Sequence, residues 1–107
     1  MNPLRIAIGL VGKSNHKVFK HVAVVIRGGA IVSVATNHDT THAEIAALNK
    51  CWPSERKGTK MWSIRVTRGG KLSMAKPCAN CERYMRESGV KTVFYTTTSG
   101  TIEKMKL

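Results

Sequence analysis

The spacing of hydrophobic residues divides the chain into helix-like and strand-like segments separated by glycines. Apolar residues recur at helical spacing over 4–11, which predicts a short first helix. Two runs rich in valine, isoleucine and alanine follow at 21–27 and 30–35, with Gly28 and Gly29 between them. β-Branched runs on either side of a Gly-Gly pair are typical of a tight β-hairpin. We therefore expect a hairpin at this place.

Beyond the hairpin, the pattern predicts two helices with a strand between them, and then a final pair of strands. The first of these helices starts at the turn over 37–41 and ends before Pro53, because the residue before a proline disfavours helical geometry. Its apolar face carries Ile45, Leu48 and Trp52. The other expected elements are a polar loop at 54–60, a strand at 61–67, a helix from Pro77 through Met85 closed by Gly89, and strands at 91–97 and 101–106.

The order of these elements predicts an α/β fold. The last two strands are joined by the short turn 98–100, so they must run antiparallel, since a parallel return needs a long crossover. Helices that alternate with strands indicate one mixed sheet with helices on its faces. A chain of 107 residues can bury one core, so we expect a single domain over 1–107.

Charge adds an expectation about partners. The chain has 18 Lys and Arg against 6 Asp and Glu, a formal net charge of +12. Such a field favours phosphates, nucleic acid or an anionic membrane face, although a solvated basic surface is the alternative. One basic stretch leads into the second long helix, so we expect some of its charge near a site there. It holds Lys50, Arg56, Lys57, Lys60, Arg65, Arg68, Lys71 and Lys76, against the single acid Glu55.

The cysteines indicate a metal pair rather than a disulfide framework. There are three, and Cys78 and Cys81 are separated by only two residues. Cys51 is better explained as a small buried residue. The apolar stretch near the N-terminus is too short for a secretion signal, and no apolar run approaches the length of a membrane span. We therefore expect a reducing, cytoplasmic location.

Two short motifs carry the chemistry, each at the start of a predicted helix. One is Thr41-His42-Ala43-Glu44 and the other is Pro77-Cys78-Ala79-Asn80-Cys81. One histidine and two thiolates can hold Zn²⁺ with an open fourth position, as a catalytic site requires. Glu44 is then close enough to exchange protons with a water at that position without ligating the metal. This pair of motifs resembles the H-x-E and P-C-x-x-C signature of zinc deaminases.

Each motif has a simpler explanation by itself. Thr41 and Glu44 also fit a capping box. Cys78 and Cys81 could be a redox pair, or half of a structural zinc site in a basic nucleic-acid-binding module. A structural zinc needs a fourth protein ligand, for which His38 or Cys51 is the nearby candidate. The occurrence of both motifs at the starts of separate helices favours the catalytic interpretation.

With these motifs in place, the chain resembles the cytidine deaminase superfamily over nearly its whole length. The segment from Phe19 to Asn37 resembles the first two strands of that family. The segment 39–48 is similar to the His-Ala-Glu helix of deoxycytidylate and tRNA adenosine deaminases, and 77–95 resembles the second metal helix and the strand after it.

The resemblance implies a three-layer α/β/α fold with zinc between two helix N-termini. It implies that Asn37 contacts the sugar or base edge, that the Ala43 backbone meets the pyrimidine carbonyl, and that Phe19 lies near the ring. An ordinary core position is the alternative for Phe19. Members of the family commonly form dimers or tetramers, so we expect a homo-oligomer.

The expected function is therefore zinc-dependent conversion of cytosine to uracil in a cytidine nucleoside or nucleotide. An alternative is deamination of cytosine or adenine in single-stranded DNA or RNA. The His-Ala-Glu motif points to one branch of the family and the antiparallel last hairpin to the free-nucleoside and toxin-type branches. That conflict concerns the substrate and not the reaction. A non-catalytic basic zinc module that binds nucleic acid is the alternative from another class.

Overall fold

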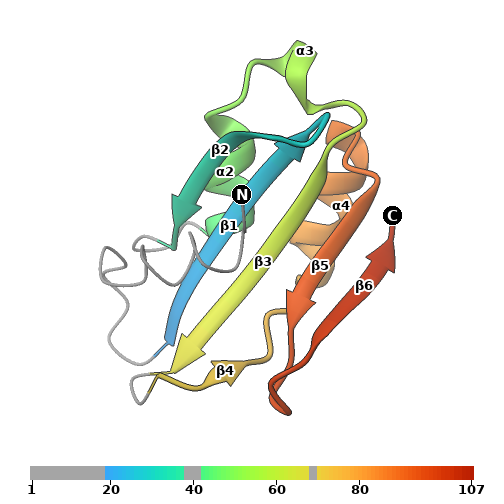
Figure 1. The fold of residues 1–107 in the computed structure, drawn as a ribbon. Coiled ribbons are helices and arrows are strands. Elements are labelled where there is room, and N and C mark those ends of the chain that lie inside the picture. The colour runs from blue at the N-terminus through green and yellow to red at the C-terminus, as the bar shows by residue number, and fades with distance from the viewer. Residues whose placement is uncertain (1–18, 38–41, 68–69) are drawn as a thin grey trace.

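A mixed six-stranded sheet forms the centre of the computed structural model, which describes residues 19–37, 42–67 and 70–107 (Figure 1). The strand order is β2-β1-β3-β5-β6, and β4 pairs with β3 beside this path. Only the β3–β5 pair is parallel among the described pairs. The strands are β1 (Phe19–Arg27), β2 (Ala30–Thr36), β3 (Lys60–Thr67), β4 (Leu72–Ser73), β5 (Thr92–Thr96) and β6 (Ile102–Lys106).

The two hairpins that the sequence predicts are both present. In the first, β1 and β2 pair up to Arg27 opposite Ala30, with Gly28 (φ 59°) and Gly29 (φ 80°) between them. Positive φ at both central positions is the geometry of a type I′ turn, which glycine adopts without steric cost. In the second, β5 and β6 are antiparallel from Thr92 opposite Lys106.

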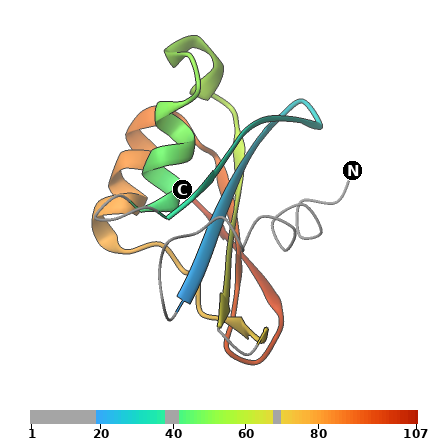
Figure 2. The same ribbon diagram turned by 90° about the vertical axis from the view of Figure 1, so that its left-hand side faces the viewer.

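Two helices pack side by side on one face of the sheet: α2 (Ala43–Asn49) and α4 (Ala79–Ser88) (Figure 2). α4 lies in the connection between the parallel strands β3 and β5, so its N-terminus lies near their carboxyl ends. Gly89 ends α4 in the left-handed region at φ 97°, as the sequence predicts.

Alternation along the strands divides the apolar residues between the two faces of the sheet. On the helix side, Ala23 and Val25 of β1 join a fully buried cluster with helix and strand residues. The other members with no exposed surface are Ala43, Ala47, Leu48, Met61, Met85 and Val93. On the opposite side, Val22 and Val24 are buried with Ile64 and Val66. The period of two places His21 on the helix side, two residues before Ala23.

The α/β class, the mixed sheet and the antiparallel last hairpin are confirmed. The first predicted helix, over 4–11, lies outside the described residues. One boundary is wrong: α2 ends at Asn49, and Trp52 is 75% exposed instead of lying on its apolar face. Pro53 explains this, because Trp52 before it is extended (ψ 142°).

The sequence also missed two short elements. The helix α3 (Pro53–Arg56) occupies the start of the segment expected as a loop, and β4 extends the sheet beside β3. No helix within the described ranges is long and apolar enough to cross a membrane.

Candidate metal and proton-transfer site

The N-termini of α2 and α4 bring three potential metal ligands together. His42 is the N-cap residue of α2, Cys78 is the N-cap residue of α4, and Cys81 lies in the first turn of α4. His42 Nδ1 is 3.1 Å from Cys81 Sγ and 3.9 Å from Cys78 Sγ. All three ligand atoms lie within 4.8 Å of one another. Tetrahedral zinc with ordinary bond lengths separates such atoms by about 3.6–3.8 Å, so these residues fit the ion.

Local sequence explains why these side chains converge. Pro77 precedes Cys78, whose extended backbone (ψ 166°) turns the chain into α4. Cys78 and Cys81 are then separated by about one helical turn and face the same side. The unsatisfied N–H groups at a helix N-terminus carry partial positive charge, which favours thiolates there.

The surroundings of Cys81 disfavour its thiolate form when no cation is bound. Burial raises the pKa of its thiol, and Glu44 and Cys78 raise that pKa further. A buried thiolate beside a carboxylate is therefore unfavourable by itself. Zn²⁺ among these ligands would offset this cost, because metal ligation deprotonates a thiol.

Glu44 lies at the second position of α2 with only 2% of its surface exposed. Because His42 is the N-cap residue and makes no side-chain capping bond, Glu44 is not at the third helical position that a capping box requires. Burial raises the pKa of the Glu44 carboxyl, while a backbone hydrogen bond, His42 and Arg65 partly lower it. A carboxyl group that is easily protonated beside a metal site suits proton transfer.

A buried polar group that the sequence did not single out lies beneath Glu44. His21 Nδ1 is 3.6 Å from Glu44 Oε1, and its Nε2 is 2.6 Å from Ser63 Oγ. Arg65 Nη2 is 3.3 Å from the same Nδ1. The spacing of the histidines in the sequence does not indicate that His21 lies beside Glu44. Only the pairing of β1 with β3 brings His21 opposite Arg65.

The residues expected to contact substrate are placed as follows. Asn37 is tied to β1, because its Oδ1 accepts from His21 N (3.1 Å) and its own N donates to His21 O (2.9 Å). Ala43 is the first residue of α2 and is fully buried. The backbone of Phe19 starts β1, but its side chain lies outside the described part of the structure.

Of the two candidates for a fourth protein ligand, the structure describes only Cys51. Cys51 lies beyond the other end of α2, where its thiol is 3.5 Å from Ala47 O. His38 lies outside the described residues. Within the ranges that the structure describes, the ligand cluster contains His42, Cys78 and Cys81 alone.

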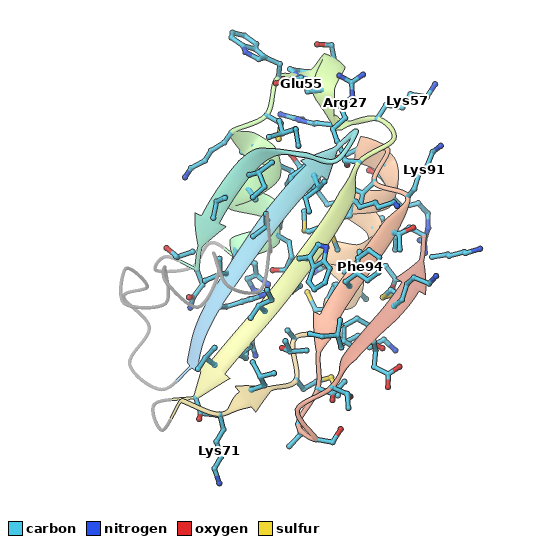
Figure 3. All side chains as sticks on the ribbon, in the orientation of Figure 1. Arg27, Glu55, Lys57, Lys71, Lys91 and Phe94 are labelled. Carbon is cyan, nitrogen blue, oxygen red and sulfur yellow. The ribbon has the colours of Figure 1, made fainter. Side chains whose placement is uncertain are left out.

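The basic residues divide between the two ends of the sheet. Gly58 N donates to Gly89 O, and Lys91 N donates to Thr59 O, so the chain around Lys57 lies at the C-terminal end of α4, away from the ligands. Figure 3 shows Arg27, Lys57 and Lys91 together at that end and Lys71 at the other. Two members of the basic stretch are close to the site. Arg65 contacts His21, and Lys76 precedes Cys78 by two residues in the sequence. Only some of the positive charges of the basic stretch therefore lie near the site.

Both tryptophans lie away from the ligands. Trp62 stacks on Phe94 with ring centroids 4.9 Å apart, and it packs with the cluster on the sheet face opposite the helices. Trp52 precedes α3 at the basic end of the sheet.

Comparison with solved structures agrees with this fold. A solved cytidine deaminase from Mycobacterium leprae matches 94% of this chain and 87% of its own, with a TM-score of 0.62 and 16% identity. Two forms of RibD from Acinetobacter baumannii match 88% of this chain at 14% identity, with TM-scores of 0.61 and 0.60. This chain spans only 27% and 26% of the length of those RibD structures. At these identities the likeness shows the fold.

No curated protein matches the chain significantly in sequence. The family model described as the cytidine and deoxycytidylate deaminase zinc-binding region matches residues 2–97, which is most of the chain. The chain therefore belongs to the cytidine and deoxycytidylate deaminase family, whose members bind zinc.

Proposed function

We infer that this protein catalyses the hydrolytic deamination of cytosine to uracil in a cytidine nucleoside or nucleotide, with release of ammonia. The observation that carries the proposal is a buried carboxyl group beside a cluster of three ligands. A structural zinc takes four protein ligands, whereas a catalytic zinc keeps a position open. Among the described residues the cluster offers His42, Cys78 and Cys81 and no fourth ligand. Glu44 then has a chemical role that a structural site does not give it.

In the proposed mechanism, His42, Cys78 and Cys81 would hold zinc, which would act as a Lewis acid and lower the pKa of water. Glu44 accepts a proton from the attacking water and returns protons to the ring nitrogen and the departing amino group. The C–N bond to the amino group breaks as a C–O bond forms, so water and cytosine give uracil and ammonia. Asn37 and the Ala43 backbone are proposed to hold the sugar or base edge, and Phe19 to lie near the ring.

A substrate panel tests this proposal. The purified protein is incubated with cytidine, deoxycytidine, their monophosphates, adenosine and short single strands, and the deaminated product and ammonia are both measured. We expect turnover of at least one cytosine compound, with loss of turnover in Cys78→Ala. Stoichiometric zinc together with tight nucleic-acid binding and no turnover on any member would favour the non-catalytic zinc module instead.

A single-stranded polynucleotide is the second candidate substrate, and the charge at the far end of the sheet favours it. Lys57, Lys60 and Lys91 are exposed there, and Trp52 presents a 75% exposed ring at the same end. Lys60 and Arg65 are separated by about 17 Å along β3, since a strand rises about 3.3 Å per residue. A mononucleotide bound beside Arg65 cannot reach that far, whereas a strand of several nucleotides can.

This difference gives a direct experiment. Substituting glutamine for both Lys57 and Lys60 should lower kcat/KM on a short cytosine-containing strand. The same variant should leave kcat/KM for cytidine monophosphate unchanged. It should also reduce the salt slope for the strand by about 1–2 units, because fewer counterions are released. Lys104→Gln, on the edge strand β6, is the control, because it removes an exposed positive charge from another part of the sheet. Equal effects of both variants on both substrates would exclude the polynucleotide candidate.

We also propose that the protein is a homo-oligomer. Trp52, Met74 (44%) and Ile102 (37%) are the large apolar side chains exposed on the described surface, and Ile102 begins the edge strand β6. Apolar groups and a free strand edge are common sites of association. Light scattering at micromolar concentration tests this, and a monomeric mass would contradict it.

A further inference from the structure

The chain that leads into α4 is attached to the sheet by buried hydrogen bonds that the deaminase chemistry above does not use. This lead-in segment runs from Ser73, the last residue of β4, to Pro77. Ala75 N donates to Thr96 O (2.9 Å), and Ala75 O accepts from Ser63 Oγ (2.9 Å). Thr96 Oγ1 donates to Ser73 O at 2.7 Å. The lead-in segment is therefore attached to both β3 and β5.

Thr96 lies at the point where β3 changes partner. One edge of β3 pairs with β1, so β5 and β4 share the other edge, β5 over 60–63 and β4 over 65–66. At this junction Arg65 N donates to Thr96 Oγ1 (3.1 Å), and the same hydroxyl donates to Ser73 O. A hydroxyl can do both, because it has one hydrogen and two lone pairs. The Thr96 side chain therefore bridges a main-chain donor of β3 and a main-chain acceptor of β4.

Both hydroxyl groups that hold the lead-in segment are enclosed. Ser63 and Thr96 have no exposed surface, and Ala75 is 2% exposed. A buried main-chain group that loses its hydrogen bond destabilises the structure around it, because water cannot replace the partner. Removal of the Thr96 hydroxyl takes this partner from Arg65 N and Ser73 O at once. We therefore expect the lead-in segment to move when that hydroxyl is lost.

The segment between these hydrogen bonds and the metal ligand has little freedom. Cys78 follows Ala75 by three residues, which span at most about 11 Å. The ring of Pro77 fixes its own φ and restricts Lys76 to extended geometry. Cys78 needs this support, because it is exposed and its side chain makes no capping hydrogen bond. Cys81, in contrast, is buried within the first turn of α4.

We propose that Ser63 and Thr96 are positioning residues for the zinc ligand Cys78. Their hydroxyl groups fix the main chain at Ser73 and Ala75, and the restricted segment that follows carries this placement to the thiolate. The proposal rests on the role of Cys78 in the proposed function, but its test does not need turnover. Groups that orient a metal ligand from outside the coordination sphere typically change metal affinity by about 10–100-fold when they are removed.

Thr96→Val tests the proposal, because valine has nearly the shape of threonine and lacks the hydroxyl. The Kd for zinc is measured by competition with a chromophoric chelator, below the Tm of the zinc-free protein, so that folding does not contribute to it. We expect this Kd to rise by about 10–100-fold in Thr96→Val. Thr96→Ser keeps the hydroxyl and should recover most of that loss. A rise of less than about tenfold in a folded Thr96→Val protein overturns the proposal.

Ser63→Ala is the second variant, and it removes one bond to the lead-in segment instead of two main-chain contacts. The Kd for zinc should rise in the same direction. Ser63 Oγ also lies 2.6 Å from His21 Nε2, so Thr96→Val is the cleaner change where both proteins fold. If Thr96→Val does not fold, Ser63→Ala decides, and a native Kd for zinc in that variant overturns the proposal.

A purely structural role for these hydroxyl groups predicts a different result. Thr96→Val would then lower the Tm of the zinc-free protein and leave the Kd for zinc unchanged. Ser33→Ala is the matched control, because Ser33 Oγ is also buried and donates to a main-chain oxygen, Ala47 O at 2.7 Å, in the last turn of α2. It should lower the Tm of the zinc-free protein and keep the native Kd for zinc. An equal rise of Kd in Ser33→Ala and Thr96→Val overturns the positioning role.

These measurements separate failure of this proposal from failure of the proposed function, because none of them uses a substrate. A protein that turns over no cytosine compound but shows the expected Kd values rejects the deaminase function and keeps the positioning role. An active enzyme whose Kd for zinc does not respond to Thr96→Val rejects the positioning role and keeps the function.

Discussion

Replacing Cys81 and Cys51 with alanine separates a metal ligand from an ordinary buried cysteine. The two side chains are equally buried, at 1% and 3% exposure, so each substitution removes one sulfur atom from the core. That loss costs about 1 kcal/mol in either variant. Cys81, unlike Cys51, lies 3.1 Å from His42 Nδ1, in the cluster that joins α2 to α4.

The contribution of the metal can be worked out from this difference. Zinc that binds only the folded chain stabilises it by about 4 kcal/mol when free zinc exceeds the Kd by about 1,000-fold. For a domain of this size, that amounts to about 15–30 °C in Tm. The native protein and Cys51→Ala should both lose this increment when a chelator is added. Cys81→Ala should already have lost it.

The assay is thermal unfolding of each protein with excess zinc and with a chelator, together with zinc analysis. The informative quantity is the change in Tm on chelation, because the cost of the missing sulfur cancels. We expect a large change for the native protein and Cys51→Ala, and none for Cys81→Ala. Equal changes in Tm for both variants would refute the assignment of Cys81 as a ligand.

Further expectations follow from single contacts. The pKa of His21 is lowered to about 3 in the folded protein from its ordinary value of 6.5, so below pH 6.5 the unfolded chain binds the extra proton. The free energy of unfolding should therefore fall as pH drops below 6.5, by at most about 1.4 kcal/mol per pH unit from this group, and denaturant titrations of His21→Asn should show a flatter profile. Gly89→Ala should lower the free energy of unfolding by about 1–3 kcal/mol because of backbone strain at φ 97°, and by more because the new Cβ would lie 2.7 Å from Lys57 Cα. Gly100→Ala, at φ 84° with no atom within 4 Å of the new Cβ, should show the strain alone in the same unfolding assay. Asn37→Ala should raise KM more than it lowers kcat, as steady-state kinetics can show, because Asn37 is proposed to hold substrate and not to transfer protons.

Elements defined by local signals could be predicted from the sequence. Gly28 and Gly29 specify the turn of the first hairpin, and Gly89 marks the end of α4. The ligand pair Cys78 and Cys81 is separated by one helical turn, so its convergence needs no knowledge of the fold. In each case a few adjacent residues determine the geometry.

Features that depend on distant contacts could not be predicted. The environment of His21 arises from the β1–β3 register. This register brings His21 beside Ser63 and Arg65, which follow it by 42 and 44 positions in the sequence. No pattern within β1 specifies that register. Trp52 was placed on a helix face because its spacing fits, but the conformation before Pro53 decided against it. Lys57 and Lys60 likewise lie between the two metal motifs in the sequence, but in the fold they lie at the end of the sheet away from the ligands.

Glu44→Gln tests the central claim most directly, because glutamine keeps the shape and hydrogen bonding of the side chain and removes its ability to carry a proton. The measurement is product formation by native and variant protein on the best cytosine substrate, with zinc content and Tm determined on the same samples. We expect native zinc and fold, with kcat lowered by at least about 10²–10⁴-fold. A zinc-loaded, folded variant with activity within about tenfold of the native protein would contradict the assignment of Glu44 as the proton carrier, since that is less than acid–base catalysis contributes.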